Sequence, residues 1–108
     1  MSLDIWFACD SCGHEDDSFN ITHNMCEMAR KAKVYECLWN PIENKMMLAE
    51  DIIEPLKKGI EKMESKPDYF KKFDPPNKWG SYDSFLKFCK EVLDAARRAP
   101  KSKIGISK

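Results

Sequence analysis

The sequence predicts an α+β domain in which a small, mainly antiparallel sheet, made of an N-terminal hairpin and a C-terminal strand, is covered on one face by about three helices. Two patterns predict this fold class. Near both ends of the chain, apolar residues recur at every second position, as in a half-buried strand. Between the ends they recur at the three- and four-residue spacing of an amphipathic helix. A chain of 108 residues with 43% apolar content suits one core, so we expect a single domain over residues 1–108.

The predicted hairpin spans about residues 3–21. Leu3, Ile5 and Phe7 occupy alternate positions, and the same period resumes in "FNI" after the run "CDSCGHEDDS". That run holds a glycine and several acidic residues but no apolar period, which is typical of a turn. The segment "KIGIS" near the C-terminus shows the strand period again and predicts a short last strand, which could pair with the first.

The first predicted helix carries one apolar stripe over residues 25–32. Asn24 is placed to cap this helix, and Glu27, three residues later, would complete a capping box. A helix start also leaves backbone N–H groups without partners, which favours a bound anion or a carbonyl oxygen there.

Further helices are predicted in the second half of the chain. An apolar stripe over residues 52–63 follows a start signal at Asp51, and Pro55 suits a helix only in its first turn or at a kink. The last helix is expected from near Ser81 to Pro100, and the run "PDYFKKF" before it adds a helical turn.

A ligand pocket is predicted from polar residues at a strand end and aromatic residues in irregular chain. Asn20, Thr22 and Asn24 point the same way if the second strand continues to Asn24. "YECLWNP" and "PPNKWGSYDSF" each set a tryptophan beside an asparagine and a proline, and aromatic faces with a few amides are common in small-molecule sites. The alternative is that these residues are ordinary helix caps and loops packed on the core. The predicted ligand-binding residues are Asn20, Thr22, Asn24, Trp39, Asn77 and Trp79.

A metal site is the second candidate. Cys9 and Cys12 are spaced as in a zinc knuckle, in which two thiolates hold one tetrahedral ion. One knuckle supplies half a site, and His23 with Cys26 is the best source of the other half. The alternative is a hairpin turn that carries two free thiols, so zinc is a candidate cofactor but not a required one.

Composition narrows the class of protein. Five cysteines without a signal peptide argue against a secreted disulfide framework, and Cys37 and Cys89 are expected in the core. No apolar run approaches the ~20 residues of a membrane span, so we expect a soluble, cytoplasmic protein with no membrane partner. The formal net charge is zero, so nucleic acid is not an expected partner.

The chain also resembles a group of small uncharacterised proteins of bacteria and their phages. The likeness covers "LDIWFACDSCG", "NITHNM", "YECLWNP", "NKWGSYDSFLKF" and the terminal "IGISK". These proteins share an Asn-x-Thr-x-Asn element after an N-terminal hairpin and a later Trp-Gly. The resemblance implies that Asn20, Thr22 and Asn24 are the positions of interest and that Cys9 and Cys12 lie at a hairpin tip. It implies no activity.

Two hypotheses follow. The first is a non-enzymatic binding module whose pocket holds a small polar ligand or a peptide segment of a protein partner. The second is a small zinc-knuckle adaptor for protein interaction or nucleic acid that uses Cys9 and Cys12. The sequence favours binding over catalysis, because no set of residues matches a known catalytic arrangement. The exposed edge of a short strand would allow a homo-oligomer, although nothing in the sequence requires one.

Overall fold

Three strands form an antiparallel sheet in the order β2-β1-β3, in a computed structural model that describes residues 2–8, 15–22, 25–73 and 81–107. The central strand pairs with both of the others, so the predicted hairpin and the predicted pairing of the last strand with the first are confirmed. The strands are β1 (Ser2–Ala8), β2 (Glu15–Thr22) and β3 (Lys103–Ser107).

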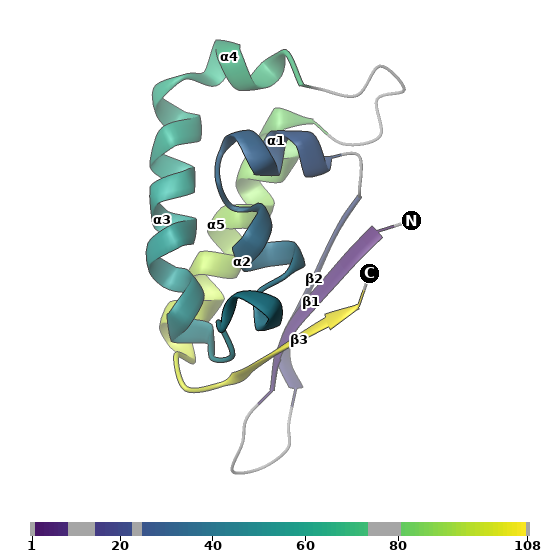
Figure 1. Ribbon diagram of the computed structural model, residues 1–108, viewed down its shortest axis with the longest axis vertical. Helices are drawn as coiled ribbons and strands as arrows, with labels where there is room; N and C mark the ends of the chain where they lie inside the picture. The colour runs from purple at the N-terminus through teal and green to yellow at the C-terminus, as the bar shows by residue number, and fades with distance from the viewer. Residues whose placement is uncertain (1, 9–14, 23–24, 74–80, 108) are drawn as a thin grey trace.

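The two faces of the sheet differ as the strand period requires. Leu3, Ile5 and Phe7 of β1 are fully buried on the inner face, whereas Asp4 and Trp6 on the outer face are only half-buried. All the helices of the described chain lie on the inner side of the sheet (Figure 1). The fold class predicted from the sequence, an α+β domain with helices on one face of a small sheet, is therefore confirmed.

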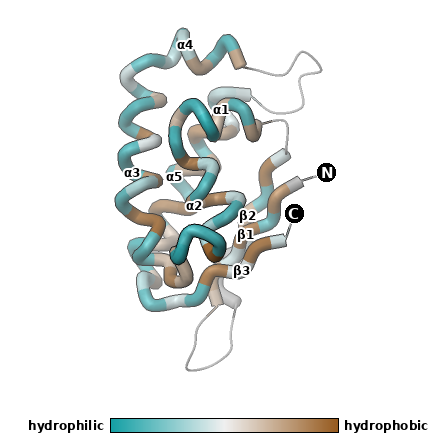
Figure 2. Tube along the Cα trace, in the orientation of Figure 1, coloured by the Kyte–Doolittle hydropathy of each residue, from teal (hydrophilic) through white to brown (hydrophobic). Residues whose placement is uncertain are grey.

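The helical layer is dominated by two long helices that lie side by side and run in opposite directions (Figure 1). Both alternate between hydrophobic and hydrophilic residues along their length, as Figure 2 shows for α3. The shorter helices fill the space around this pair. The helices are α1 (Cys26–Lys31), α2 (Tyr35–Trp39), α3 (Ala49–Ser65), α4 (Pro67–Lys71) and α5 (Tyr82–Arg98), with a 3₁₀ turn at Ile42–Asn44.

The start of α3 differs from the prediction. The helix begins at Ala49, and Asp51 is its third residue, where the carboxylate accepts the backbone N–H groups of Met47 and Leu48 at 3.2 and 3.1 Å. Asp51 therefore caps the helix from inside its first turn. Pro55 lies one turn further on, within the helix.

The start of α1 also differs. Met25 occupies the N-cap position of α1, without a side-chain cap, and Asn24 lies outside the described residues. The prediction for α5 is confirmed: Ser81 is its N-cap, with its hydroxyl accepting the backbone N–H of Ser84 at 3.2 Å. The predicted helical turn in "PDYFKKF" is α4.

The core lies between the sheet and the helices. Cys37 and Cys89 are buried in it as free thiols, as the sequence predicted. Within the described ranges, no helix is both long enough and apolar enough to cross a membrane.

Candidate functional site

The three described residues of the predicted pocket, Asn20, Thr22 and Trp39, do not share one face of the molecule. Asn20 lies on the outer face of the sheet, where its amide Nδ2 donates to Asp4 Oδ1 on β1 at 2.7 Å. Thr22, two residues further along β2, lies on the same face and is half-buried. Trp39 lies on the other side of the sheet, in the core. The sheet thus separates Trp39 from Asn20 and Thr22.

Trp39 was predicted in irregular chain, and this prediction is wrong. It is the last residue of α2, only 2% exposed, and its indole stacks on the Tyr35 ring at a centroid distance of 5.5 Å. It also packs against Phe85 of α5 at 6.4 Å. A ring enclosed in this way joins α2 to α5 and offers no face to a ligand.

The remaining predicted site residues lie outside the described residues: Asn24, Asn77 and Trp79 of the pocket, and Cys9, Cys12 and His23 of the metal site. Among the residues that the structure does describe, no cluster of three or more histidine, cysteine or acidic side chains could hold a metal ion. Binding of zinc at Cys9 and Cys12 remains a prediction of the sequence.

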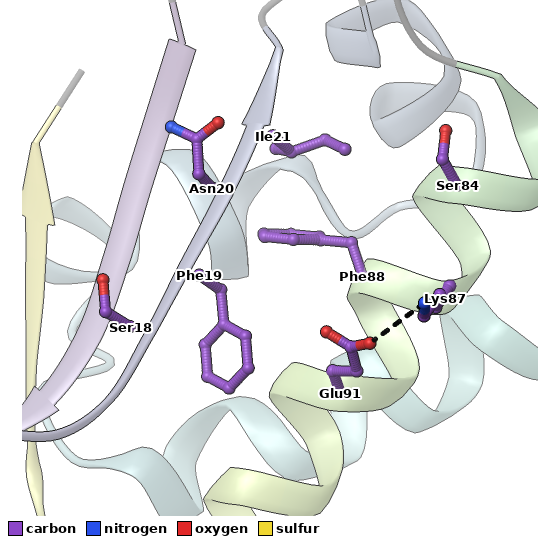
Figure 3. Close-up of a pocket in the computed structure, with 8 residues that line it drawn as sticks. All are labelled: Ser18, Phe19, Asn20, Ile21, Ser84, Lys87, Phe88 and Glu91. Carbon is purple, nitrogen blue, oxygen red and sulfur yellow. Dashed lines mark ion pairs between the residues drawn. The ribbon is translucent and has the colours of Figure 1, made fainter.

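The structure instead shows a groove between the edge strand β2 and helix α5 (Figure 3). Its first part is a hollow of about 310 Å³. Three largely buried aromatic or aliphatic side chains, Phe19, Ile21 and Phe88, form the apolar part of its lining. The polar part comes from Ser18, Asn20, Ser84, Lys87 and Glu91.

The apolar lining is fixed in place by packing. Phe19 meets Phe7 of β1 edge to face at a centroid distance of 6.5 Å, and Phe88 stacks on Phe85 at 6.2 Å. Phe88 is only 5% exposed, so its ring is held by the core and presents little more than an edge. The groove is therefore shallow and preformed, with a floor that does not need to rearrange.

A second hollow of about 480 Å³ continues the groove along α5. It shares Phe19 and Glu91 with the first hollow and adds Asp94 and Arg98. Ile21 lies beside the Ser84 end of α5 and Phe19 lies closer to Glu91, so β2 and α5 run in opposite directions along the groove (Figure 3).

The charged side chains of the groove are exposed and weakly paired. Lys87 Nζ lies 3.9 Å from Glu91 Oε1, one helical turn away, and such exposed pairs contribute little stability. Arg98 Nε donates to the backbone carbonyl of Asp94 at 3.4 Å. Along the whole groove, the two basic side chains Lys87 and Arg98 balance the two acidic side chains Glu91 and Asp94.

The opposite edge of the sheet is arranged differently. Backbone N–H of Ile104 on β3 donates to the carbonyl of Met47 at 3.1 Å, and Leu48 forms a bridge with Lys103. A third hollow of about 580 Å³ lies there, and it includes the exposed side chains of Ile42 and Met47. At this edge, part of β3 already has a backbone partner from the chain itself.

The groove was not predicted, although one signal for it was in the sequence. If both the second and the last strand pair with the first, the second strand must be an edge of the sheet. Which helix lies beside that edge depends on the path of α3 and α4, which the period of apolar residues does not give.

Comparison of the chain with protein-family models, with curated proteins and with solved structures found no match.

Proposed function

We propose that the protein is a non-enzymatic binding module that takes an extended peptide segment of a partner protein along the outer edge of β2, in the groove beside α5. The observation that carries this proposal is the hollow with an apolar floor and a polar rim that the edge strand and the helix line jointly (Figure 3). Addition of a strand to a sheet edge is a common mode of peptide recognition, in which main-chain hydrogen bonds give affinity and side-chain pockets give specificity.

The choice of β2 over β3 rests on what already occupies each edge. Edge strands carry backbone N–H and C=O groups that can template another strand. At β3, the Met47 carbonyl takes the N–H of Ile104 and Leu48 bridges Lys103, so an incoming strand would have to displace the chain itself. β2 pairs with β1 on one side and faces the α5 groove on the other.

The size of the groove suits one or two side chains and not a folded ligand. In a strand, alternate side chains point to the same side, about 7 Å apart. A guest strand beside β2 would therefore direct every second side chain towards Phe88 and α5. Its other side chains would lie on the outer face, beside Ser18 and Asn20.

The test is binding of a strand-forming probe peptide, acetyl-Ser-Thr-Val-Thr-Val-Thr-Ser-amide, followed by fluorescence anisotropy and by amide hydrogen exchange. In β2, one alternate set of amides bonds to β1, and the other set points to the groove side. We expect the probe to raise protection of the second set only, a two-residue pattern that contact through side chains alone would not give.

A variant that blocks the groove and a matched variant elsewhere on the surface test where the probe binds. Glu91→Trp places a large ring at an exposed α5 position that lines both hollows, and Glu61→Trp makes the same change on the exposed side of α3. Binding should be lost in the first variant and kept in the second. Probe binding that is equal in both, or protection that shows no alternation in β2, would contradict the proposal. Concentration-dependent protection without peptide would show instead that a second copy of the chain occupies the edge.

A further inference from the structure

We infer that the guest segment carries an apolar residue followed two positions later by a basic one, and that it runs antiparallel to β2. This inference rests on the proposed function and adds the chemistry and the direction of the partner. It follows from the different composition of the two hollows, from the direction of β2 along the groove, from the greater stability of antiparallel pairing, and from the two-residue period of a strand.

The apolar position belongs to the first hollow. Phe19, Ile21 and Phe88 meet there, and Lys87 and Glu91 on its rim carry opposite charges. This hollow therefore favours an apolar side chain, which would lose contact with water against the rings.

The basic position belongs to the second hollow. Glu91 and Asp94 line it together with Arg98, and because Glu91 already pairs with Lys87, Asp94 is the carboxylate available to a guest there. The Arg98 Nε–H group is directed at the Asp94 backbone carbonyl, and no ion pair within the described chain engages the Asp94 carboxylate. A lysine or arginine of the guest would provide that carboxylate with a partner.

The two positions lie slightly further apart along α5 than alternate residues of a strand. Phe88 and Asp94 are six residues apart on α5, which corresponds to about 9 Å along the helix axis. Residues i and i+2 of a strand are about 7 Å apart. The long side chain of a lysine or arginine reaches across the difference between this distance and the spacing on α5. Residue i+1 points to the outer face and is not selected by this groove.

The order of the two residues follows from the direction of the strands. β2 runs from the Asp94 end of the groove towards the Ser84 end (Figure 3). A guest antiparallel to β2 runs the other way, so its apolar residue comes first and its basic residue second. Antiparallel pairing is the slightly more stable arrangement per residue.

Three probe peptides test this inference: acetyl-Ser-Thr-Val-Thr-Lys-Thr-Ser-amide, its order-reversed form with lysine before valine, and its charge-reversed form with glutamate for lysine. We expect the first to bind about threefold to fivefold more tightly than either of the others, the ratio of one exposed ion pair. Asp94→Lys should invert the preference between lysine and glutamate, and Asp94→Asn should abolish it. Glu61→Lys, the same kind of charge change on α3, should leave it unchanged.

The outcomes separate the inference from the proposed function. Equal binding of all three probes, with binding still lost in Glu91→Trp, would overturn the inferred order and charge while the groove remained the site. Preference for the order-reversed probe would overturn the direction. Failure of every probe to bind, including the valine-only peptide, would overturn the proposed function along with the inference.

Discussion

The indole of Trp6 lies against Gly105 on the outer face of the sheet, where the two residues face each other across β1 and β3. A Cβ atom added at Gly105 would lie 2.1 Å from Trp6 Cε2 and 2.2 Å from Nε1. Real atoms do not approach so closely, so the ring occupies the space that any other residue at position 105 would fill. This packing covers the outer face of β3 with an aromatic ring from its neighbour.

The first prediction concerns this contact. Gly105→Ala should displace the Trp6 ring and lower the free energy of unfolding by about 1 kcal/mol, at the lower end of overpacking costs because the ring lies on a partly exposed face. Urea unfolding measures the stability, and the tryptophan emission spectrum reports the movement of the indole.

The control for this prediction is the same change without the ring. In a Trp6→Ser background, Gly105→Ala should be neutral or stabilise by up to about 1 kcal/mol, because alanine is preferred to glycine inside a strand. An equal loss in both backgrounds would show that the Trp6 contact does not cause the effect.

The second prediction concerns the buried thiols. Burial raises the pKa of Cys37 from 9.0 to about 12 and raises that of Cys89 well above 9.0. The Cys37 thiol also donates to the Val34 carbonyl at 3.2 Å. Because the thiolate is the reactive form, both should react with an aromatic disulfide reagent far more slowly than the half-buried Cys26. Mass spectrometry of native labelled protein assigns the rates, and equal labelling of Cys26 and Cys37 would contradict the prediction.

The same shift makes stability depend on alkaline pH. The unfolded chain loses its thiol protons first, because its thiol pKa values lie below those of the folded protein. The stability contributed by Cys37 is therefore complete below about pH 9 and lost as the pH rises towards 12. The loss is at most about 1.4 kcal/mol per pH unit for each thiol. Cys37→Ala should show a shallower decline in urea unfolding over this range, and an unchanged slope would contradict the assignment.

Much of the fold was predictable from the sequence because its two periods are clear. Leu3, Ile5 and Phe7 are fully buried on one face, so the intervening residues Asp4 and Trp6 had to lie on the other face. The 17-residue helix α5 had a serine cap and an uninterrupted apolar stripe. The five-residue α2 was missed because one turn and a half is too short to show a helical period.

The candidate site was less predictable because it depends on tertiary placement. Trp39 beside "NP" is typical of a loop, yet its contacts with Tyr35 and Phe85 place it in the core. Asn20 was predicted to bind a ligand, but its amide Nδ2 donates to Asp4 Oδ1 across the hairpin. Phe88 lies in an apolar stripe that any core helix would have, and only its position beside an edge strand makes it part of a groove.

The third prediction tests the metal hypothesis. If Cys9 and Cys12 bind structural zinc, protein purified without added metal should contain stoichiometric zinc, and a chelator should lower its thermal midpoint, because metal binding then contributes to folding. Elemental analysis and thermal unfolding with and without chelator measure both. The double variant Cys9→Ser/Cys12→Ser should lose the metal and the chelator effect together. Metal-free protein whose thermal midpoint does not change with chelator would contradict the metal hypothesis and favour the alternative, a hairpin turn that carries two free thiols.

A hydrogen bond between distant residues connects the two long helices. The buried Tyr82 hydroxyl at the start of α5 donates to the backbone carbonyl of Met63 near the end of α3, at 2.8 Å. The last four carbonyls of a helix lack a helical N–H donor. The Met63 carbonyl could not receive a backbone hydrogen bond even if the helix continued, because the residue four positions later is Pro67, which has no N–H group. The Ser65 hydroxyl likewise donates to the backbone carbonyl of Lys62, at 2.8 Å.

The last prediction follows from this bond. Tyr82→Phe keeps the ring and its packing but leaves the Met63 carbonyl without its donor in a buried position, which should lower the free energy of unfolding by about 1–3 kcal/mol. Tyr69→Phe removes a hydroxyl from a ring that is 40% exposed and should change stability by less than about 0.5 kcal/mol. Because Tyr82 lies at the N-terminal end of α5, its loss should also increase amide exchange in the first turn of that helix before the rest. Similar urea midpoints for the two variants would mean that water replaces the lost donor, and that Tyr82 connects α3 to α5 only through the packing of its ring.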